Sequence, residues 1–102
     1  MLVAVNPELV GAIREKRLIE FLYKSGPARV VEPYDYGVRR GEASLLGYQI
    51  SGPSRSGVAH GWKHFKVHEM RQLRVLDTRF PGTRAGLMQH HHEWDILFAR
   101  VG

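Results

Sequence analysis

The sequence contains no cysteine among its 102 residues. Disulfide bonds, thiolate nucleophiles and cysteine-ligated zinc are therefore excluded, and packing alone must stabilise the fold. No apolar run approaches the roughly 20 residues that a membrane-spanning helix needs. The first residues also lack the charged, apolar and small-residue pattern of a secretory signal. We therefore expect a cytoplasmic protein that is not attached to a membrane.

The composition is that of a soluble globular protein, with 43% hydrophobic and 25% charged residues. A length of 102 residues allows one small domain, so we expect a single stand-alone domain over residues 1–102. A domain of this size needs most of its apolar side chains for its core. The sequence therefore predicts a shallow surface site rather than a deep cavity.

Positive charge exceeds negative charge, since 15 basic and 10 acidic residues give a net charge of +5. The excess lies mostly in the second half, because residues 1–50 hold seven basic and six acidic residues and residues 51–102 hold eight and four. This balance favours polyanions or acidic surfaces as partners, through long-range attraction and counterion release. A charge of this size also serves solubility alone, and both interpretations stay open.

One helix is predicted, over residues 6–17. Asn6 offers an N-cap oxygen, Pro7 suits the first helical position, and Glu8 places negative charge at the positive end of the helix dipole. The apolar residues that follow have the spacing of one helical face. This helix would therefore bury one side against the rest of the domain.

From Leu18 the pattern changes to the two-residue period of a strand. The first two strands pair as a hairpin, the second strand ends at Pro33, and Arg39–Glu42 forms a tight turn before the third. The predicted strands are residues 18–24, 28–32, 43–50, 62–68 and 73–77, with a last strand near 94–101.

A helix followed by short strands, with no helix between them, indicates antiparallel pairing. We therefore expect a mainly β fold, a small antiparallel β-barrel or strongly curved sheet with an N-terminal α-helix. The barrel core would span residues 18–80, and residues 83–102 would form a C-terminal extension that contains the last strand.

The strand predicted over residues 62–68 presents the most informative face. Alternation places Trp62, His64 and Lys66 on one side, with Phe65 and Val67 directed inward. An indole, an imidazole and an ammonium group in a row could stack a nucleobase and hold an anionic group. The alternative is an ordinary solvated face on which Trp62 covers one end of the fold.

Five other residues are candidates for the same site. Arg29 lies in the middle of a predicted strand and needs a carboxylate, a phosphate or water, so it belongs to an internal salt bridge or to an anion site. Tyr48 alternates with apolar residues, which indicates a partly buried ring with its hydroxyl at the surface. Arg39, Arg40 and Arg55 would contribute positive field rather than defined geometry.

Neither a metal site nor an active site is predicted. His64 and His68 would lie about 13 Å apart along a strand, too far to share an ion. Adjacent side chains of the His90-His91-His92 run would point to opposite sides, which rarely forms a closed metal site. The sequence also lacks a P-loop, a dinucleotide-binding glycine pattern and a nucleophile with an oriented base. We therefore expect a non-enzymatic protein without a cofactor.

The order of several segments carries a resemblance to a known family. After the helix come Ile19–Tyr23, Arg29–Pro33, the Gly-x-x-x-Leu-Leu-Gly-Tyr segment ending at Tyr48, Phe65–Val67, and Leu73 onward to Phe80. Together these segments, over about Leu9 to Phe80, resemble the WYL domain of bacteria. The resemblance implies an Sm-like β-barrel that senses ligands or binds nucleic acid, commonly joined to a helix-turn-helix in transcriptional regulators of stress and phage-defence genes.

The sequence departs from the family at its best-known residues. Ala43-Ser44-Leu45 stands where the family has Trp-Tyr-Leu. In the family's Phe-Arg-Leu-Asp-Arg-Ile stretch, the first arginine corresponds to Lys66 and the second to Glu69, which reverses the charge. Arg29 matches the arginine of the Arg-x-x-x-Pro segment. The resemblance therefore implies the fold more strongly than the usual ligand.

We expect a WYL-like module that recognises a nucleotide or single-stranded nucleic acid. The alternative is a structural or protein-interaction domain, in which an edge strand pairs with a protein partner or with a second copy. The first hypothesis requires that Arg29 and Lys66 meet beside the indole of Trp62. The residues expected to bind the ligand are Arg29, Trp62, His64, Lys66, Tyr48, Arg39, Arg40 and Arg55.

Overall fold

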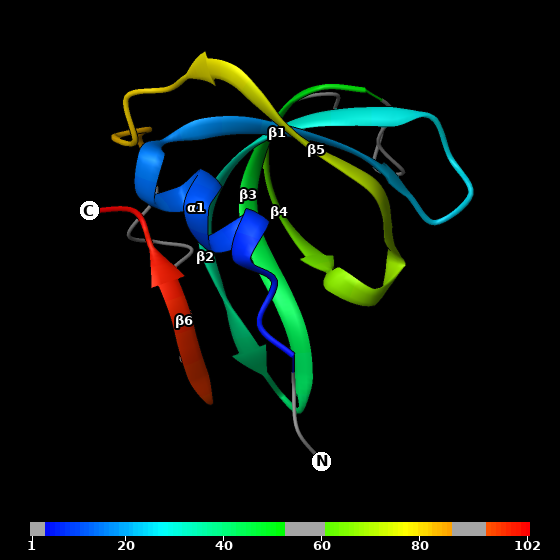
Figure 1. Ribbon diagram of the computed structural model, residues 1–102, viewed down its shortest axis with the longest axis vertical. Helices are drawn as coiled ribbons and strands as arrows, with labels where there is room; N and C mark the ends of the chain where they lie inside the picture. The colour runs from blue at the N-terminus through cyan, green and yellow to red at the C-terminus, as the bar shows by residue number, and fades with distance from the viewer. Residues whose placement is uncertain (1–3, 53–60, 87–93) are drawn as a thin grey trace.

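The fold is a single antiparallel sheet with one α-helix packed against it (Figure 1). The computed structural model describes residues 4–52, 61–86 and 94–102. The elements in chain order are α1 (Pro7–Glu15), β1 (Arg17–Tyr23), β2 (Ala28–Arg39), β3 (Glu42–Ser51), β4 (Gly61–Lys66), the 3-10 helix η1 (Val67–Glu69), β5 (Met70–Arg79) and β6 (Ile96–Arg100).

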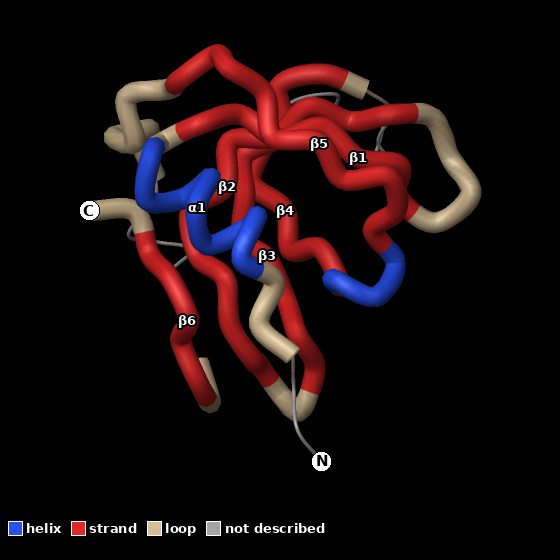
Figure 2. Tube along the Cα trace, viewed as in Figure 1, coloured by secondary structure: helices blue, strands red, loops and turns tan. Residues whose placement is uncertain are grey.

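The strands follow the order β4-β3-β2-β1-β5, and β6 pairs with β2 off this path. All the pairings are antiparallel. The prediction of a mainly β, antiparallel fold with an N-terminal helix is therefore confirmed. Among the described strands the sheet is not closed, because the path ends at β4 and at β5. A closed barrel is thus not confirmed, and the curvature in Figure 2 is that of an open sheet.

Helix α1 begins as predicted, with the Asn6 side-chain oxygen accepting the N–H of Glu8 at 2.9 Å. It ends at Glu15, two residues before the predicted boundary, because Lys16 adopts a left-handed conformation with φ of 54°. The helix packs across β1, β2, β5 and β6. Within the described ranges, no helix is both long and apolar enough to span a membrane.

Strand β2 differs most from the prediction, since it continues through Pro33 to Arg39 instead of ending at Pro33. On one side β2 pairs with β1 over residues 28–31 and with β6 over residues 35–38, so Pro33 lies between the two partners. On the other side its register against β3 shifts just after Pro33. Proline is tolerated at such breaks because no regular ladder hydrogen bond depends on its missing N–H.

The turn after β4 also differs from the prediction. β4 ends at Lys66, and η1 makes the turn that the sequence placed around residues 69–72. β5 consequently begins at Met70 and is longer than predicted. The ends of β4 and β1 are joined here, because the Lys66 N–H donates to the Tyr23 hydroxyl at 2.9 Å.

Apolar side chains gather in two clusters. The larger one joins α1 to the inner side of the sheet: Leu9, Ala12, Ile13, Ile19, Phe21, Tyr23, Val31, Tyr36, Leu45, Phe65 and Ala99. The smaller one contains Leu18, Tyr34 and Phe80, with Tyr48, Trp62 and other apolar side chains packed against them. Since Leu18 and Ile19 are consecutive on β1, strand alternation puts the two clusters on opposite faces of the sheet.

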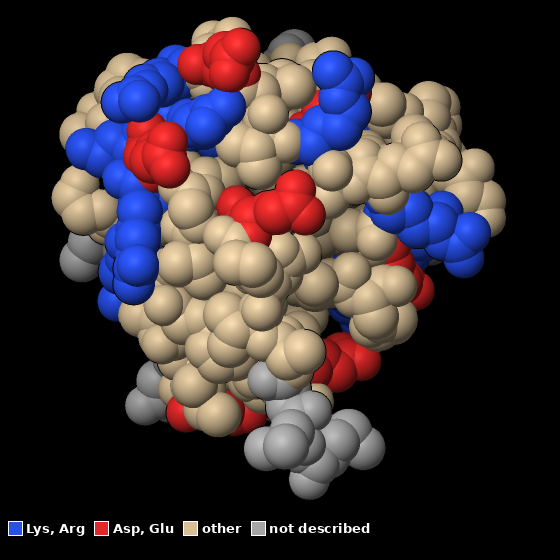
Figure 3. Space-filling model, in the orientation of Figure 1, with Lys and Arg blue, Asp and Glu red and all other residues tan. Residues whose placement is uncertain are grey.

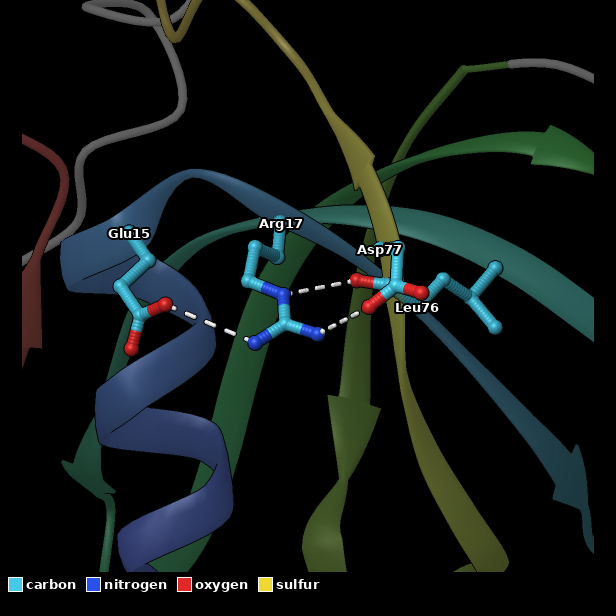
Figure 4. A network of polar contacts seen from close by, with 4 residues as sticks. All are labelled: Glu15, Arg17, Leu76 and Asp77. Carbon is cyan, nitrogen blue, oxygen red and sulfur yellow. Dashed lines mark hydrogen bonds and ion pairs between the residues drawn. The ribbon is translucent and has the colours of Figure 1, made fainter.

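Arg17 ties the end of α1 to β5 (Figure 4). Its Nε donates to the Leu76 carbonyl at 2.8 Å, and its two terminal nitrogens contact Asp77 at 2.9 Å and Glu15 at 3.5 Å. Both carboxylates are exposed. The ion pairs therefore contribute about 1 kcal/mol or less each, and the backbone contact fixes the position of the guanidinium.

Candidate ligand-binding site

A pocket of about 430 Å³ brings together the end of β1, the β2–β3 turn and the end of β4. Four of the residues expected to bind the ligand line it: Arg39, Arg40, His64 and Lys66. The described residues that line it, which we call the basic pocket, are Tyr23, Lys24, Arg39, Arg40, Glu42, Ser44, His64, Phe65 and Lys66. The pocket therefore combines four Lys and Arg side chains with one carboxylate.

The β2–β3 turn brings two of these cations to the pocket. Arg40 and Gly41 both have positive φ, 53° and 78°, which is typical of the two-residue type I′ hairpin. The prediction of a tight turn at this place is confirmed. Because only two residues connect the strands, Arg39 and Arg40 lie at the very end of the hairpin, next to β4.

Lys66 reaches the pocket from the end of β4. It pairs in register with Ser44 on β3, and its ammonium nitrogen lies 3.9 Å from the Glu42 carboxylate. About half of each of these two charged side chains is exposed. Such a pair is worth roughly 1 kcal/mol or less, so an incoming phosphate can compete with Glu42 for Lys66.

Arg29 lies next to the basic pocket, because it contacts Tyr23, which is one of the lining residues. Its guanidinium carbon is 5.1 Å from the centroid of the Tyr23 ring, and its Nη1 donates to the Gln49 side-chain oxygen at 3.3 Å. Among the described residues, no carboxylate lies within ion-pair distance of Arg29. Burial and the charge of Arg29 together lower the pKa of Lys63, which shows that two cations are close here.

Tyr23 connects the two cations that the sequence hypothesis requires to meet. Lys66 contacts its hydroxyl through the backbone, and Arg29 lies over its ring. Trp62 lies elsewhere, in the smaller cluster, with ring centroids 4.8 Å from Tyr34 and 5.4 Å from Tyr48. The Arg29 guanidinium and the Lys66 backbone N–H thus both contact Tyr23, whereas the Lys66 ammonium group lies at Glu42 and the indole of Trp62 packs in the smaller cluster.

The remaining candidates fall into two groups. His64 lines the basic pocket and also lies near the Trp94 ring, with centroids 6.4 Å apart. Tyr48 lies with Trp62, away from the pocket lining. Arg55 and the His90–His92 run lie outside the described residues. Among the described residues there is no cluster of three side chains suited to hold a metal ion.

Sequence reasoning missed Tyr23, Lys24 and Lys63. Lys63 lies two residues before Phe65 on β4, and this spacing indicates that both side chains are on the same, inward face of the strand. Lys24 follows β1 with a φ of 58°, and nothing local indicates that its side chain lines the same pocket as Arg40. Tyr23 is a buried residue of the larger cluster, and its hydroxyl also reaches β4.

A second group of polar side chains surrounds the buried carboxylate of Glu32. Arg84 binds it with two hydrogen bonds, at 2.8 Å from Nε and 2.7 Å from Nη2, and Tyr34 donates its hydroxyl at 2.9 Å. The Arg84 guanidinium carbon lies 3.8 Å from the centroid of the Tyr48 ring. A pocket of about 390 Å³ adjoins this group. The carboxylate is thus paired, as a buried charge requires.

The Tyr34 hydroxyl should make the fold less stable as the pH rises in the alkaline range. Burial and the hydrogen bond to Glu32 raise the pKa of Tyr34 far above 10. Above about pH 10 the unfolded chain therefore loses this proton first, and the free energy of unfolding falls by up to about 1.4 kcal/mol per pH unit. Tyr34→Phe should reduce this dependence of the free energy of unfolding on pH, as measured by urea unfolding between about pH 9 and 11. Part of the dependence should remain, because burial also raises the pKa of Tyr23. An unchanged slope would contradict the prediction.

Charge alone does not mark the site. On the face shown in Figure 3, basic side chains form separate groups near the margins, and acidic side chains lie between them and near the centre. No single continuous positive field covers that face. The basic pocket is distinguished by the convergence of cations from three segments rather than by net charge.

Comparisons with known proteins agree with the fold. The family model described as "WYL domain" matches residues 4–75. Among solved structures, Proteasome accessory factor B/C (PafBC) of Arthrobacter aurescens is similar with a TM-score of 0.58 and 23% sequence identity, over 85% of this chain. This chain spans 14% of the PafBC chain, so the likeness concerns the fold of one part of that protein. No curated protein matches the chain. Because the family model matches more than half of the 102 residues, the chain belongs to the WYL domain family.

Proposed function

We propose that this WYL domain is a non-enzymatic regulatory module that recognises a nucleotide or single-stranded nucleic acid at the basic pocket. The observation that carries the proposal is the convergence of Lys24, Arg39, Arg40 and Lys66 from three separate segments on one pocket. Lys24 and Lys66 have carboxylate partners, Glu69 and Glu42, each at 3.9 Å, so the four cations leave an excess of positive charge that an anionic ligand would balance.

The dimensions and chemistry of the pocket fit a phosphate-bearing ligand. Its volume of about 430 Å³ lies within the range of small-molecule sites. The two arginines offer planar donor groups that can bind phosphate through two hydrogen bonds each, and Lys66 offers a point charge. Arg29 and Lys63 continue the positive charge past Tyr23. This continuation favours a short strand with several phosphates over a single mononucleotide.

A salt titration tests the proposal. Binding of short fluorescent single-stranded DNA and RNA would be followed by anisotropy from low to physiological salt, where each phosphate contact contributes about 0.7 to the logarithmic salt slope. Arg29→Ala with Lys66→Ala should weaken binding at least about tenfold and lower the slope by about one or more.

The matched control is Arg74→Ala with Arg79→Ala, because both arginines are exposed on β5 and neither lines the basic pocket. It removes the same charge and should have little effect. Equal losses in the two double variants would show that only net charge matters. Absence of binding at low salt would overturn the proposal and favour the protein-interaction alternative, for which the exposed Ile96 and Leu97 on β6 provide a surface.

A further inference from the structure

Three aromatic rings form a continuous surface on the face of the sheet opposite α1. Tyr34 on β2, Tyr48 on β3 and Trp62 on β4 lie with neighbouring ring centroids 4.8 and 5.4 Å apart. We call these three side chains the aromatic surface. Such rings can stack nucleobases of any sequence, because every base has a flat π face.

The segment Phe80–Gly86, which follows β5, covers this surface. Phe80 packs on Tyr34 with ring centroids 5.3 Å apart, and the Trp62 indole N–H donates to the Ala85 carbonyl at 3.3 Å. Gly86 approaches so closely that a Cβ there would lie 3.2 Å from the indole nitrogen. The segment therefore lies directly against Trp62, which the sequence predicted as a ligand contact, and against its neighbour Tyr34.

Arg84 makes the strongest contact between the segment and the sheet. It binds both oxygens of Glu32. The Glu32 side chain is 6% exposed, whereas the Arg84 side chain is 36% exposed. Its guanidinium carbon lies 3.8 Å from the centroid of the Tyr48 ring, so the guanidinium occupies the space that a base stacked on this ring would need. A pocket of about 390 Å³ lies where Pro81, Thr83 and Ala85 of the segment meet the sheet, so a hollow adjoins the covered rings.

We propose that Arg84 latches Phe80–Gly86 over the aromatic surface, and that opening of this latch lets Tyr48 and Trp62 stack a nucleobase of the ligand. The inference rests on the proposed function, because a strand that runs along β4 from Lys66 to Trp62 would place phosphates in the basic pocket and a base on the aromatic surface. It predicts that a closed latch reduces affinity for strands that carry bases and leaves affinity for a bare sugar-phosphate strand unchanged.

The effect of base stacking can be separated from the effect of charge by comparing two ligands, one with bases and one without, in the Arg84→Ala variant. Arg84→Ala removes a positive charge, so simple electrostatics predicts weaker binding of any polyanion. The latch predicts the opposite sign for bases: about tenfold tighter binding of a short oligothymidylate, with no tightening for an abasic strand of equal length. Arg74→Ala, which removes another ion-paired arginine, is the matched control and should tighten neither ligand.

A double variant guards against misfolding. Arg84→Ala alone leaves the Glu32 carboxylate buried without its main partner, which destabilises a fold. Glu32→Gln with Arg84→Ala has the net charge of the wild type and no buried unpaired carboxylate. It should show the same selective tightening for oligothymidylate. Equal or weaker binding of oligothymidylate by both variants would overturn the stacking role of the aromatic surface.

Fluorescence reports the latch without any nucleic acid. In a Trp94→Phe background Trp62 is the remaining tryptophan of the chain, and acrylamide quenches it in proportion to its exposure. Both latch variants should raise the quenching constant about twofold, whereas Arg74→Ala should not. Unchanged quenching would overturn the latch. If the wild type binds neither strand, the proposed function fails, while the quenching result still decides whether Arg84 holds the segment closed.

Discussion

Replacing Gly37 with alanine should separate β6 from the sheet. A Cβ at this position would lie 2.1 Å from the Ile96 carbonyl oxygen and 3.0 Å from the Leu97 Cα. Both obstacles are backbone atoms of the paired strand, so no side chain can rotate away to make room. Overpacking of a core typically costs about 1–3 kcal/mol, and a clash with backbone should exceed that range. We expect urea denaturation to show a loss of at least about 3 kcal/mol.

The same substitution at Gly11 provides the control. Gly11 lies inside α1, where a Cβ would meet only the Glu15 carboxylate at 4.0 Å. Alanine is favoured over glycine within a helix by about 0.5–1 kcal/mol, so Gly11→Ala should stabilise the domain. Opposite signs for the two glycines would establish that the close approach of β2 and β6 matters. Similar effects would show that β6 does not pair with β2 at Gly37.

Loss of the Arg100 side chain should have the next largest effect. Asp35 on β2 is fully buried, and Arg100 on β6 binds its two oxygens at 3.0 and 3.1 Å. Removal of one member of a buried ion pair costs about 3–5 kcal/mol because the remaining charge stays desolvated, and since 38% of the Arg100 side chain is exposed we expect the lower end of that range, about 3 kcal/mol. Arg100→Ala should therefore lower the free energy of unfolding by about this amount in urea denaturation at neutral pH.

A double substitution identifies the cause of that loss. Asp35→Asn with Arg100→Met removes both charges and keeps similar side-chain volumes, so it should recover most of the lost stability. Arg74→Ala, which removes an exposed ion pair with Glu20, should cost about 1 kcal/mol or less. If the double variant is as unstable as Arg100→Ala, the loss comes from the packing of Arg100 and not from the buried carboxylate.

Local patterns in the sequence were sufficient for several elements. The start of α1 depends on Asn6, Pro7 and Glu8, which act within one turn, so it is predicted correctly. The Arg40-Gly41 turn likewise needs only its own backbone and the two strands beside it. Alternating apolar residues indicated the strands, and the order of motifs indicated the family.

The path of β2 was decided by its neighbours. Proline stops most strands because it removes a ladder hydrogen bond, and this rule placed a strand end at Pro33. The strand continues because β1 gives way to β6 beside Pro33. The residues that replace β1 as partner follow Pro33 by more than 60 positions, so no local pattern could reveal them.

By itself, therefore, the sequence determined the elements whose hydrogen bonds and apolar contacts lie within a few residues, together with the family. Only the tertiary structure decided which cations meet. Lys24, Arg40 and Lys66 are brought to one pocket by pairings of β1, β2, β3 and β4. Trp62 likewise lies on a covered surface because of a distant residue, since its indole N–H donates to the carbonyl of Ala85, 23 residues further along the chain. Long-range register sets these contacts, and register is a property of the whole sheet.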